Sequence, residues 1–140
     1  MLSLRMMLVA VLATILLCAC SGANFPLFDP ENNADHARND LLQGVRHYES
    51  GDYAEAMTLL QQAIKGGLTS KNDQVRAHKY LAFINCFTAH EAVCRGEFRK
   101  AFEIDPDFKL EPEEDGHPIW GPIFLDVKRE FPRSRSGSRQ

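Results

Sequence analysis

Apolar residues recur at steps of three and four positions through the middle of the chain, a spacing typical of one face of an α-helix. Two such stripes follow one another in residues 74–106. The first stripe consists of Val75, His78, Leu81, Ala82 and Asn85, and the second of Val93, Cys94, Phe98, Ala101 and Phe102. Pro106 follows the second stripe, and proline cannot continue a helix. The pattern therefore predicts two antiparallel helices with an apolar inner face.

The same pattern occurs upstream, in residues 37–64. Its first stripe consists of Leu41, Gly44, Val45 and Tyr48, and its second of Ala56, Leu59, Leu60, Ala63 and Ile64. Gly51 and Asp52 lie between the stripes, where the chain must turn. Residues 37–64 therefore predict another helical hairpin, placed before the first one.

The second helix of each predicted hairpin carries a start signal. Asp52 with Glu55, and Thr88 with Glu91, have the spacing of a capping box. In a capping box the first side chain accepts a hydrogen bond from a backbone N–H group, and the second side chain reaches back to another N–H group. Helix starts are therefore expected at Asp52 and Thr88.

The chain after Pro106 has a different character. Prolines and glycines interrupt residues 107–122, so no regular helix is expected there. A short helix is predicted from about Pro122 to Phe131, with Ile123, Phe124, Val127 and Phe131 on one face. Such a helix can cover the last apolar face of a helical array.

The amino terminus has the pattern of a secretion signal. Arg5 precedes an apolar run at 6–17, which is too short to span a membrane but suits the core of a signal peptide. The run ends in Leu17-Cys18-Ala19-Cys20-Ser21, which resembles a bacterial lipobox with Cys20 as the lipidated residue. An ordinary cleaved signal peptide or a short buried helix is the alternative.

The lipobox resemblance implies that Cys20 becomes the new amino terminus and receives fatty acyl chains. Ser21 in the next position implies sorting to the outer membrane. Each buried acyl methylene contributes about 0.8 kcal/mol, and stable anchoring takes more than one chain. The protein is therefore expected to be a lipid-anchored protein of the outer membrane that faces the periplasm.

Four segments are predicted along the chain. They are a lipoprotein signal peptide (1–19), a lipidated tether (20–35), a helical domain with its capping helix (36–131) and a disordered tail (132–140). The tether is polar and broken by prolines. Asn33 or Asp35 near its end is expected to cap the first helix.

The upstream hairpin resembles a tetratricopeptide repeat. The residues that carry the resemblance are Gly44, Gly51-Asp52-Tyr53, Ala56 and Ala63. Ala63 aligns with Ala101 in the second hairpin, a shift roughly four residues longer than the usual period of about 34. The extra residues are expected between Lys65 and Asn72. The resemblance implies an all-α fold of two such hairpins plus a capping helix.

Cys86 and Cys94 are the two cysteines of the predicted domain, and they flank the turn of the second hairpin. A disulfide between them is expected in the oxidising periplasm if both face inward. The alternative is that both are small core residues. Their spacing does not favour a redox-active pair.

Composition and motifs argue against several classes of function. The net charge is −3 and no basic stripe follows a helix, so nucleic acid is not an expected partner. The histidines are scattered without ligand spacing, and they are His36, His47, His78, His90 and His117. The acidic run at 111–115 lacks the pattern of a calcium loop. No catalytic motif, metal site or cofactor site is predicted.

Trp120, the only tryptophan, lies in the Gly/Pro-rich segment 116–122. We expect it to pack the capping helix against the second hairpin. The alternative is an exposed contact for a partner, because tryptophan is enriched in interface hot spots.

A more specific resemblance comes from the run FEIDPDFKLEPEEDGHPIWGPIF together with Cys86 and Cys94 and the lipobox. From about Leu42 to Lys128 the chain is similar to the tetratricopeptide lipoproteins associated with type VI secretion, the TssQ family. The resemblance implies a non-enzymatic accessory lipoprotein of a contractile secretion apparatus, with a protein partner in the cell envelope.

Stacked hairpins of this kind form a concave groove lined by their first helices, which suits a peptide or helix of a partner. The residues expected on this groove are Asp40, Gln43, His47, Lys79, Tyr80 and Phe83. Two other functions stay open. One is assistance in assembling outer-membrane proteins, pili or secretins; the other is an envelope enzyme with an unrecognised site.

Overall fold

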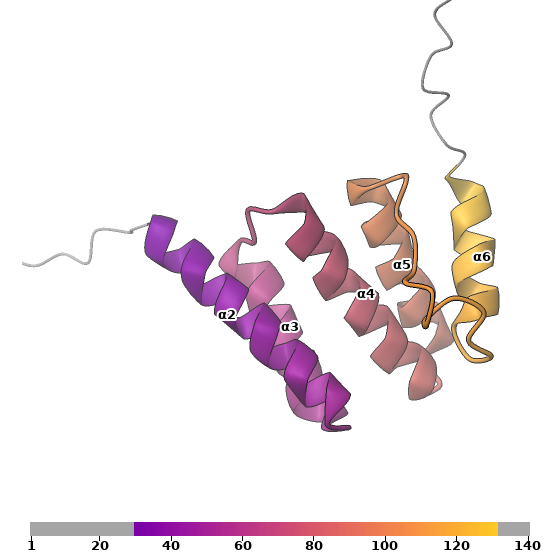
Figure 1. The fold of residues 1–140 in the computed structure, drawn as a ribbon, viewed down its shortest axis with the longest axis horizontal. Coiled ribbons are helices and arrows are strands. Elements are labelled where there is room, and N and C mark those ends of the chain that lie inside the picture. The colour runs from indigo at the N-terminus through magenta and orange to yellow at the C-terminus, as the bar shows by residue number, and fades with distance from the viewer. Residues whose placement is uncertain (1–29, 132–140) are drawn as a thin grey trace, which may run out of the picture.

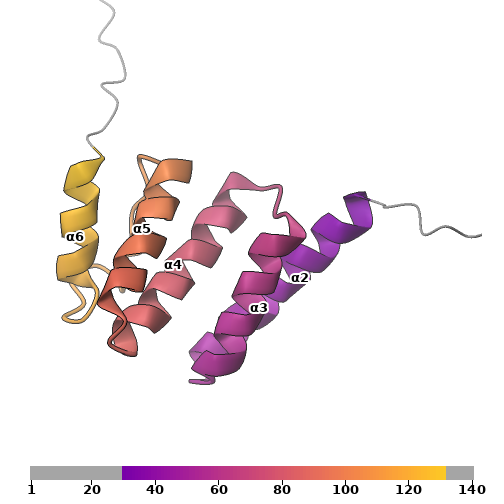
Figure 2. The ribbon, with the colours of Figure 1, turned by 180° about the vertical axis from the view of Figure 1, so that it is seen from behind.

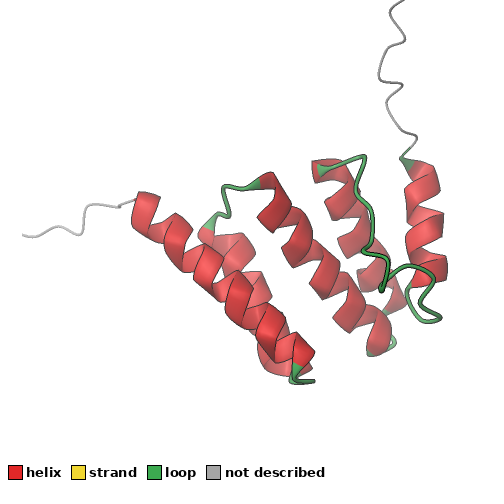
Figure 3. Ribbon diagram, in the orientation of Figure 1, coloured by secondary structure: helices red, strands yellow, loops and turns green. Residues whose placement is uncertain are grey.

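The computed structural model describes residues 30–131, and in this range it contains five helices and no strand (Figure 1, Figure 3). The helices are α2 (Pro30–Glu49), α3 (Tyr53–Gly66), α4 (Lys71–Phe87), α5 (Glu91–Ile104) and α6 (Gly121–Glu130). The predicted all-α class is therefore confirmed for the described residues. The predicted signal peptide, Cys20 and the carboxy-terminal tail lie outside them.

The helices form two antiparallel pairs that follow one another, with α6 at the end of the row (Figure 1, Figure 2). Helix α2 packs on α3, and α4 packs on α5. Helix α4 also contacts both helices of the first pair, while α6 packs against α5. Each hairpin is thus covered by the next element of the chain.

Two clusters of buried side chains form the core. The cluster of the first hairpin reaches into α4 and includes Leu41, Leu60 and Ile84. The cluster of the second hairpin extends to α6 and is mainly aromatic, with Phe83, Phe98, Phe102 and Phe124 each almost completely buried. Burying one such side chain contributes about 1.5–3 kcal/mol.

Small residues allow the first pair to pack closely. A Cβ atom added at Gly44 would lie 2.9 Å from Cγ of Leu60, which is too close for an ordinary contact. Ala56 and Ala63 on α3 are fully buried. The small positions recognised in the sequence are therefore points where α2 and α3 meet.

The capping prediction for α3 is half right. Asp52 caps this helix and accepts from the backbone N–H of Glu55 at 3.5 Å. The backbone N–H of Asp52, expected to receive the Glu55 carboxylate, donates instead to the carbonyl of His47 at 2.9 Å.

The capping prediction for α5 is wrong. Thr88 ends α4, and its hydroxyl donates to the carbonyl of Ile84 at 2.9 Å. Ala89 then takes the left-handed backbone conformation with φ +63°, and α5 begins after His90. The turn is thus two residues longer than the spacing of Thr88 and Glu91 suggested.

Two helices begin earlier than predicted. Helix α2 begins at Pro30, so Asn33 and Asp35 lie inside the helix and do not cap it. Proline suits the first turn because its missing N–H is not needed there. Helix α4 begins at Lys71 after the cap Ser70, whose hydroxyl accepts from the N–H of Asp73 at 3.4 Å. Because α2 begins at Pro30, the last part of the predicted tether is helical.

Candidate partner-binding groove

After α5 the chain runs back beside α4, on the side of α5 that faces the viewer in Figure 1. We call residues 105–114 the strap. Phe108 fixes the strap to the core, since its ring lies 5.4 Å from that of Phe102 and 5.7 Å from that of Phe124, measured between centroids. This stretch has no regular helix, as predicted.

Two ion pairs hold the strap to α4. Lys71 pairs with Asp105 at 3.1 Å, and Lys79 pairs with Glu114 at 2.5 Å. The first pair is exposed, with side-chain exposures of 60% and 34%, whereas those of the second are only 10% and 17%. Exposed pairs contribute little, but breaking a buried pair leaves an uncompensated charge. Lys79 and Glu114 are therefore the pair that matters for the strap.

A cavity of about 570 Å³ lies between the strap and one face of α4. We call it the α4 groove. Its α4 side consists of Asn72, Val75, Arg76, Lys79 and Tyr80, and its strap side of Asp105, Asp107, Phe108, Lys109, Glu111 and Glu114. The α4 residues recur at helical spacing, so they form one continuous stripe. The groove therefore offers charged, aromatic and apolar contacts together.

Trp120 closes the far end of the strap. Its ring stacks on Phe83 with centroids 4.2 Å apart, and on its other side the His117 ring lies at 3.4 Å. Its indole N–H donates to the carbonyl of Glu114 at 3.0 Å. With an exposure of 7%, Trp120 has the predicted packing role. It positions α6 and the end of the strap at once.

Two tyrosines extend the aromatic surface from α4 to α2. Tyr48 and Tyr80 meet edge to face with centroids 4.9 Å apart. Burial, with smaller effects from Tyr53, Tyr80 and Glu114, raises the pKa of Tyr48 to about 12. Burial also raises the pKa of Tyr80, although nearby Arg76 opposes the rise. Both phenols therefore stay neutral at physiological pH and can act as hydrogen-bond donors.

The structure places only two of the predicted partner-binding residues in the α4 groove, namely Lys79 and Tyr80. Asp40, Gln43 and His47 lie on α2, partly exposed but outside the lining of this cavity. His47 lies 3.3 Å from Asp52, measured from Nδ1 to a carboxylate oxygen, at the turn of the first hairpin.

Phe83 was predicted as a contact for a partner, and this is wrong. It is 1% exposed and lies beneath Trp120 in the core. Lys79 is also mostly buried, and its ammonium group is already paired with Glu114. Lys79 and Phe83 lie on the face of α4 where the sequence predicted partner contacts. Glu114 of the strap pairs with Lys79, and Trp120 stacks on Phe83, so neither side chain is free for a partner.

Sequence reasoning did not identify Arg76 or Phe108 as groove residues. Arg76 lies one helical turn from both Asn72 and Tyr80, so the polar stripe of α4 was a usable signal for it. Phe108 belongs to a stretch that the sequence marks only as irregular. Nothing local indicates that this stretch returns to α4.

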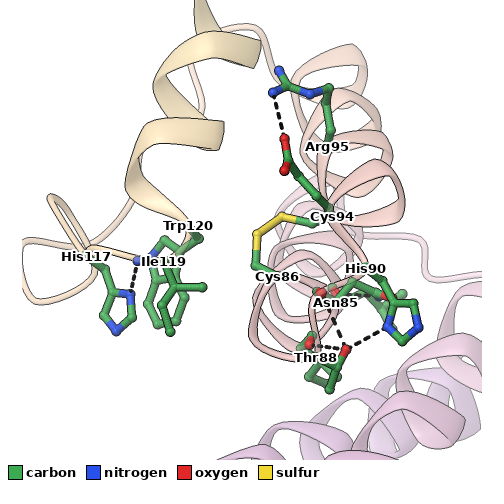
Figure 4. The surroundings of a disulfide bond; sticks show 12 residues. Asn85, Cys86, Thr88, His90, Cys94, Arg95, His117, Ile119 and Trp120 are labelled. Atoms are coloured by element: carbon green, nitrogen blue, oxygen red, sulfur yellow. Dashed lines mark hydrogen bonds and ion pairs between the residues drawn. A yellow bond between two sulfur atoms is a disulfide. The ribbon is translucent and has the colours of Figure 1, made fainter.

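Cys86 and Cys94 are joined by a disulfide, with their Cα atoms 5.1 Å apart (Figure 4). Cys86 lies near the end of α4 and Cys94 near the start of α5, and both are buried in the aromatic cluster. Beside them, Thr88 and His90 are hydrogen-bonded to each other at 3.0 Å. The disulfide thus closes the hairpin at its turn.

A cluster of three polar side chains, His78 on α4 with Glu97 and Lys100 on α5, joins these two helices. Nδ1 of His78 lies 2.6 Å from a carboxylate oxygen of Glu97, and the Lys100 ammonium lies 2.7 Å from the other oxygen. Burial alone would raise the pKa of Glu97, but the hydrogen bonds from His78 and Lys100 outweigh it and lower this pKa. The arrangement is that of an ion-paired group within the hairpin.

Within residues 30–131, no group of three or more His, Cys, Asp or Glu side chains is placed to hold a metal ion. In the same part of the chain, no helix has the length and apolar character needed to cross a membrane. Comparison of the chain with protein-family models, curated proteins and solved structures finds no match in any of the three. Function is therefore inferred from the residues and their geometry.

Proposed function

We propose that this protein is a non-enzymatic scaffold, built from two tetratricopeptide-like hairpins and a capping helix, that binds a protein partner in the cell envelope. Two observations support the repeat assignment: two helical hairpins follow one another along the chain, and small buried residues occur where α2 meets α3. Helix α6 covers the aromatic cluster at the end of the array, as a terminal cap does.

The α4 groove is the observation that carries the proposal. It lies along a first helix of a hairpin, and it combines an aromatic and apolar floor with charged walls. Such surfaces suit short peptide segments better than small metabolites, because the groove is open and its polar groups are spread along its length.

The rest of the proposal comes from the sequence. The lipobox supports an anchor at Cys20 on the periplasmic side of the outer membrane, and the run at 102–124 supports a role in type VI secretion. Assistance in assembling outer-membrane proteins, pili or secretins is the alternative client for the same scaffold.

Complementation of a deletion strain tests this function. The wild-type chain should restore type VI secretion, while Cys20→Ser should leave the protein off the outer membrane and restore little secretion, because only the cysteine thiol can take the lipid. A strain whose secretion is unaffected, but whose outer-membrane proteins or secretin multimers are lost, supports the alternative client. A mature protein that is found soluble with an unmodified amino terminus refutes the anchor.

A further inference from the structure

We propose that the α4 groove binds an extended peptide segment carrying one acidic side chain, which pairs with Arg76, beside an apolar side chain, which packs on Val75 and Phe108. This inference rests on the proposed function as a scaffold and names the class of segment that the scaffold binds.

Arg76 is the residue that sets the charge requirement. On the α4 side, Lys71 is paired with Asp105 and Lys79 with Glu114, while Lys109 is an exposed cation on the strap side. No carboxylate within residues 30–131 forms an ion pair with Arg76, whose guanidinium carbon lies 5.9 Å from the centroid of the Tyr80 ring. Covering this half-buried cation with a ligand is costly unless the ligand supplies an acceptor. A carboxylate is the strongest acceptor because it can bind the guanidinium through two hydrogen bonds.

The apolar part of the groove sets the second requirement. Val75 of α4 and Phe108 of the strap both line the cavity with the small exposed part of their side chains (6% and 7%), and half-buried Tyr80 adds an aromatic surface beside them. An aliphatic or aromatic side chain next to the acid would cover this surface and exclude water from the ion pair. One short segment with an acidic side chain next to an apolar one would therefore match both the cation and the apolar surface of the groove.

The rim of the groove limits the number of acids. Asp107 and Glu111 are exposed on the strap side with Lys109 between them, so this rim carries a net negative charge that disfavours a second carboxylate. The groove should therefore prefer a single acid among apolar neighbours over a polyacidic run. Its length agrees with a short segment: Asn72 to Tyr80 spans about 12 Å of helix at 1.5 Å per residue. An extended chain covers that distance with about four residues.

A random-peptide display selection on the full-length protein, purified in detergent, tests this inference. The wild-type protein should enrich peptides with one Asp or Glu adjacent to an apolar residue. Arg76→Glu should lose these peptides and favour ones with Lys or Arg in place of the acid. Arg46→Glu is the matched control, because Arg46 is an exposed arginine outside the groove and its change should leave the enriched peptides unaltered. Helical circular dichroism and Tm of each variant confirm that it is folded.

The expected loss can be measured on one synthetic peptide from the selection. Arg76→Gln should weaken its binding by roughly 10-fold or more, as expected for a charge-assisted hydrogen bond of about 1.5–3 kcal/mol. Polyglutamate should fail to compete with it.

Several results overturn the inference. Peptides enriched without an acid, or unchanged by Arg76→Glu, would show that a peptide groove exists but that Arg76 does not select for acids; the scaffold function would survive. No enrichment over the control would exclude a peptide site in this groove. Phe25, Leu27 and Phe28 are the large apolar residues of the predicted tether (20–35), and enrichment only after they are changed to serine would identify the tether as the occupant. Dimers that Arg76→Glu abolishes would identify a second copy.

Discussion

Trp120 lies nearly parallel to Phe83, with ring centroids 4.2 Å apart and an angle of 22° between the ring planes. Trp120 is the residue from which α6 starts, and Phe83 lies in the last two turns of α4. One contact therefore joins the capping helix, the end of the strap and the second hairpin. Its position explains why Phe83 is buried and why the groove beside α4 ends where it does.

Removing this contact should destabilise the whole domain. We expect Trp120→Ala to lower the free energy of unfolding by about 3–5 kcal/mol, as large aromatic truncations in cores do. Urea denaturation measures the loss. Ile119→Ala is the matched control. The Ile119 side chain, next to Trp120 in the sequence, is exposed, so its truncation should change the free energy of unfolding by less than about 0.5 kcal/mol. A Trp120→Ala protein that unfolds like the wild type but no longer captures a partner would show that Trp120 is a binding residue.

The pair of Lys79 and Glu114 should fix the strap. Lys79→Met leaves the Glu114 carboxylate buried without its cation, and we expect a loss of roughly 1–3 kcal/mol in the free energy of unfolding. Replacing Glu114 by Leu as well should recover part of the loss. Lys71→Met is the control, since the exposed pair with Asp105 should contribute no more than about 1 kcal/mol. Equal losses at Lys71 and Lys79 would argue against a buried pair.

Much of this fold follows from the sequence, because apolar spacing along α3, α4 and α5 is a local property. The errors occur where the outcome depends on residues far away or on turn geometry. Lys79 and Glu114 are 35 positions apart, so no pattern within α4 shows that Lys79 is already paired. Phe83 has the spacing of a groove residue, but only the placement of Trp120 decides that it is covered. Thr88 has the spacing of a cap, yet the left-handed turn at Ala89 moves the helix start beyond it.

The disulfide should stabilise the hairpin turn. Closing so short a loop contributes about 2.5 kcal/mol in the chain-entropy description. Reduction should therefore lower Tm by roughly 10–20 °C, because each kcal/mol corresponds to about 4–8 °C in a domain of this size. The oxidised protein, denatured without reductant, should not react with a maleimide at Cys86 or Cys94. Two reactive thiols under these conditions would show that the protein isolated from cells does not contain the bond.

Acid should weaken the contact between α4 and α5. The folded protein holds the pKa of Glu97 below its reference value of 4.5, so at pH values near 4 the unfolded chain binds more protons than the folded one. The stability from Glu97 is therefore present at neutral pH and is lost as the pH falls through 4.5 and then through the lower folded pKa. Urea denaturation between pH 7 and pH 3 should show a smaller decline for Glu97→Gln than for the wild type. An equal decline would place the acid sensitivity elsewhere.

The central claim is that the α4 groove binds an envelope protein, and photo-crosslinking in cells tests it most directly. A benzoylphenylalanine in place of Asn72, which lines the groove, should crosslink to a second protein in the membrane fraction. The same group at Glu55, an exposed position on α3 outside the groove, should not. Mass spectrometry should identify a type VI secretion subunit as the crosslinked protein. No crosslink from Asn72, or equal crosslinks from both positions, would contradict the account.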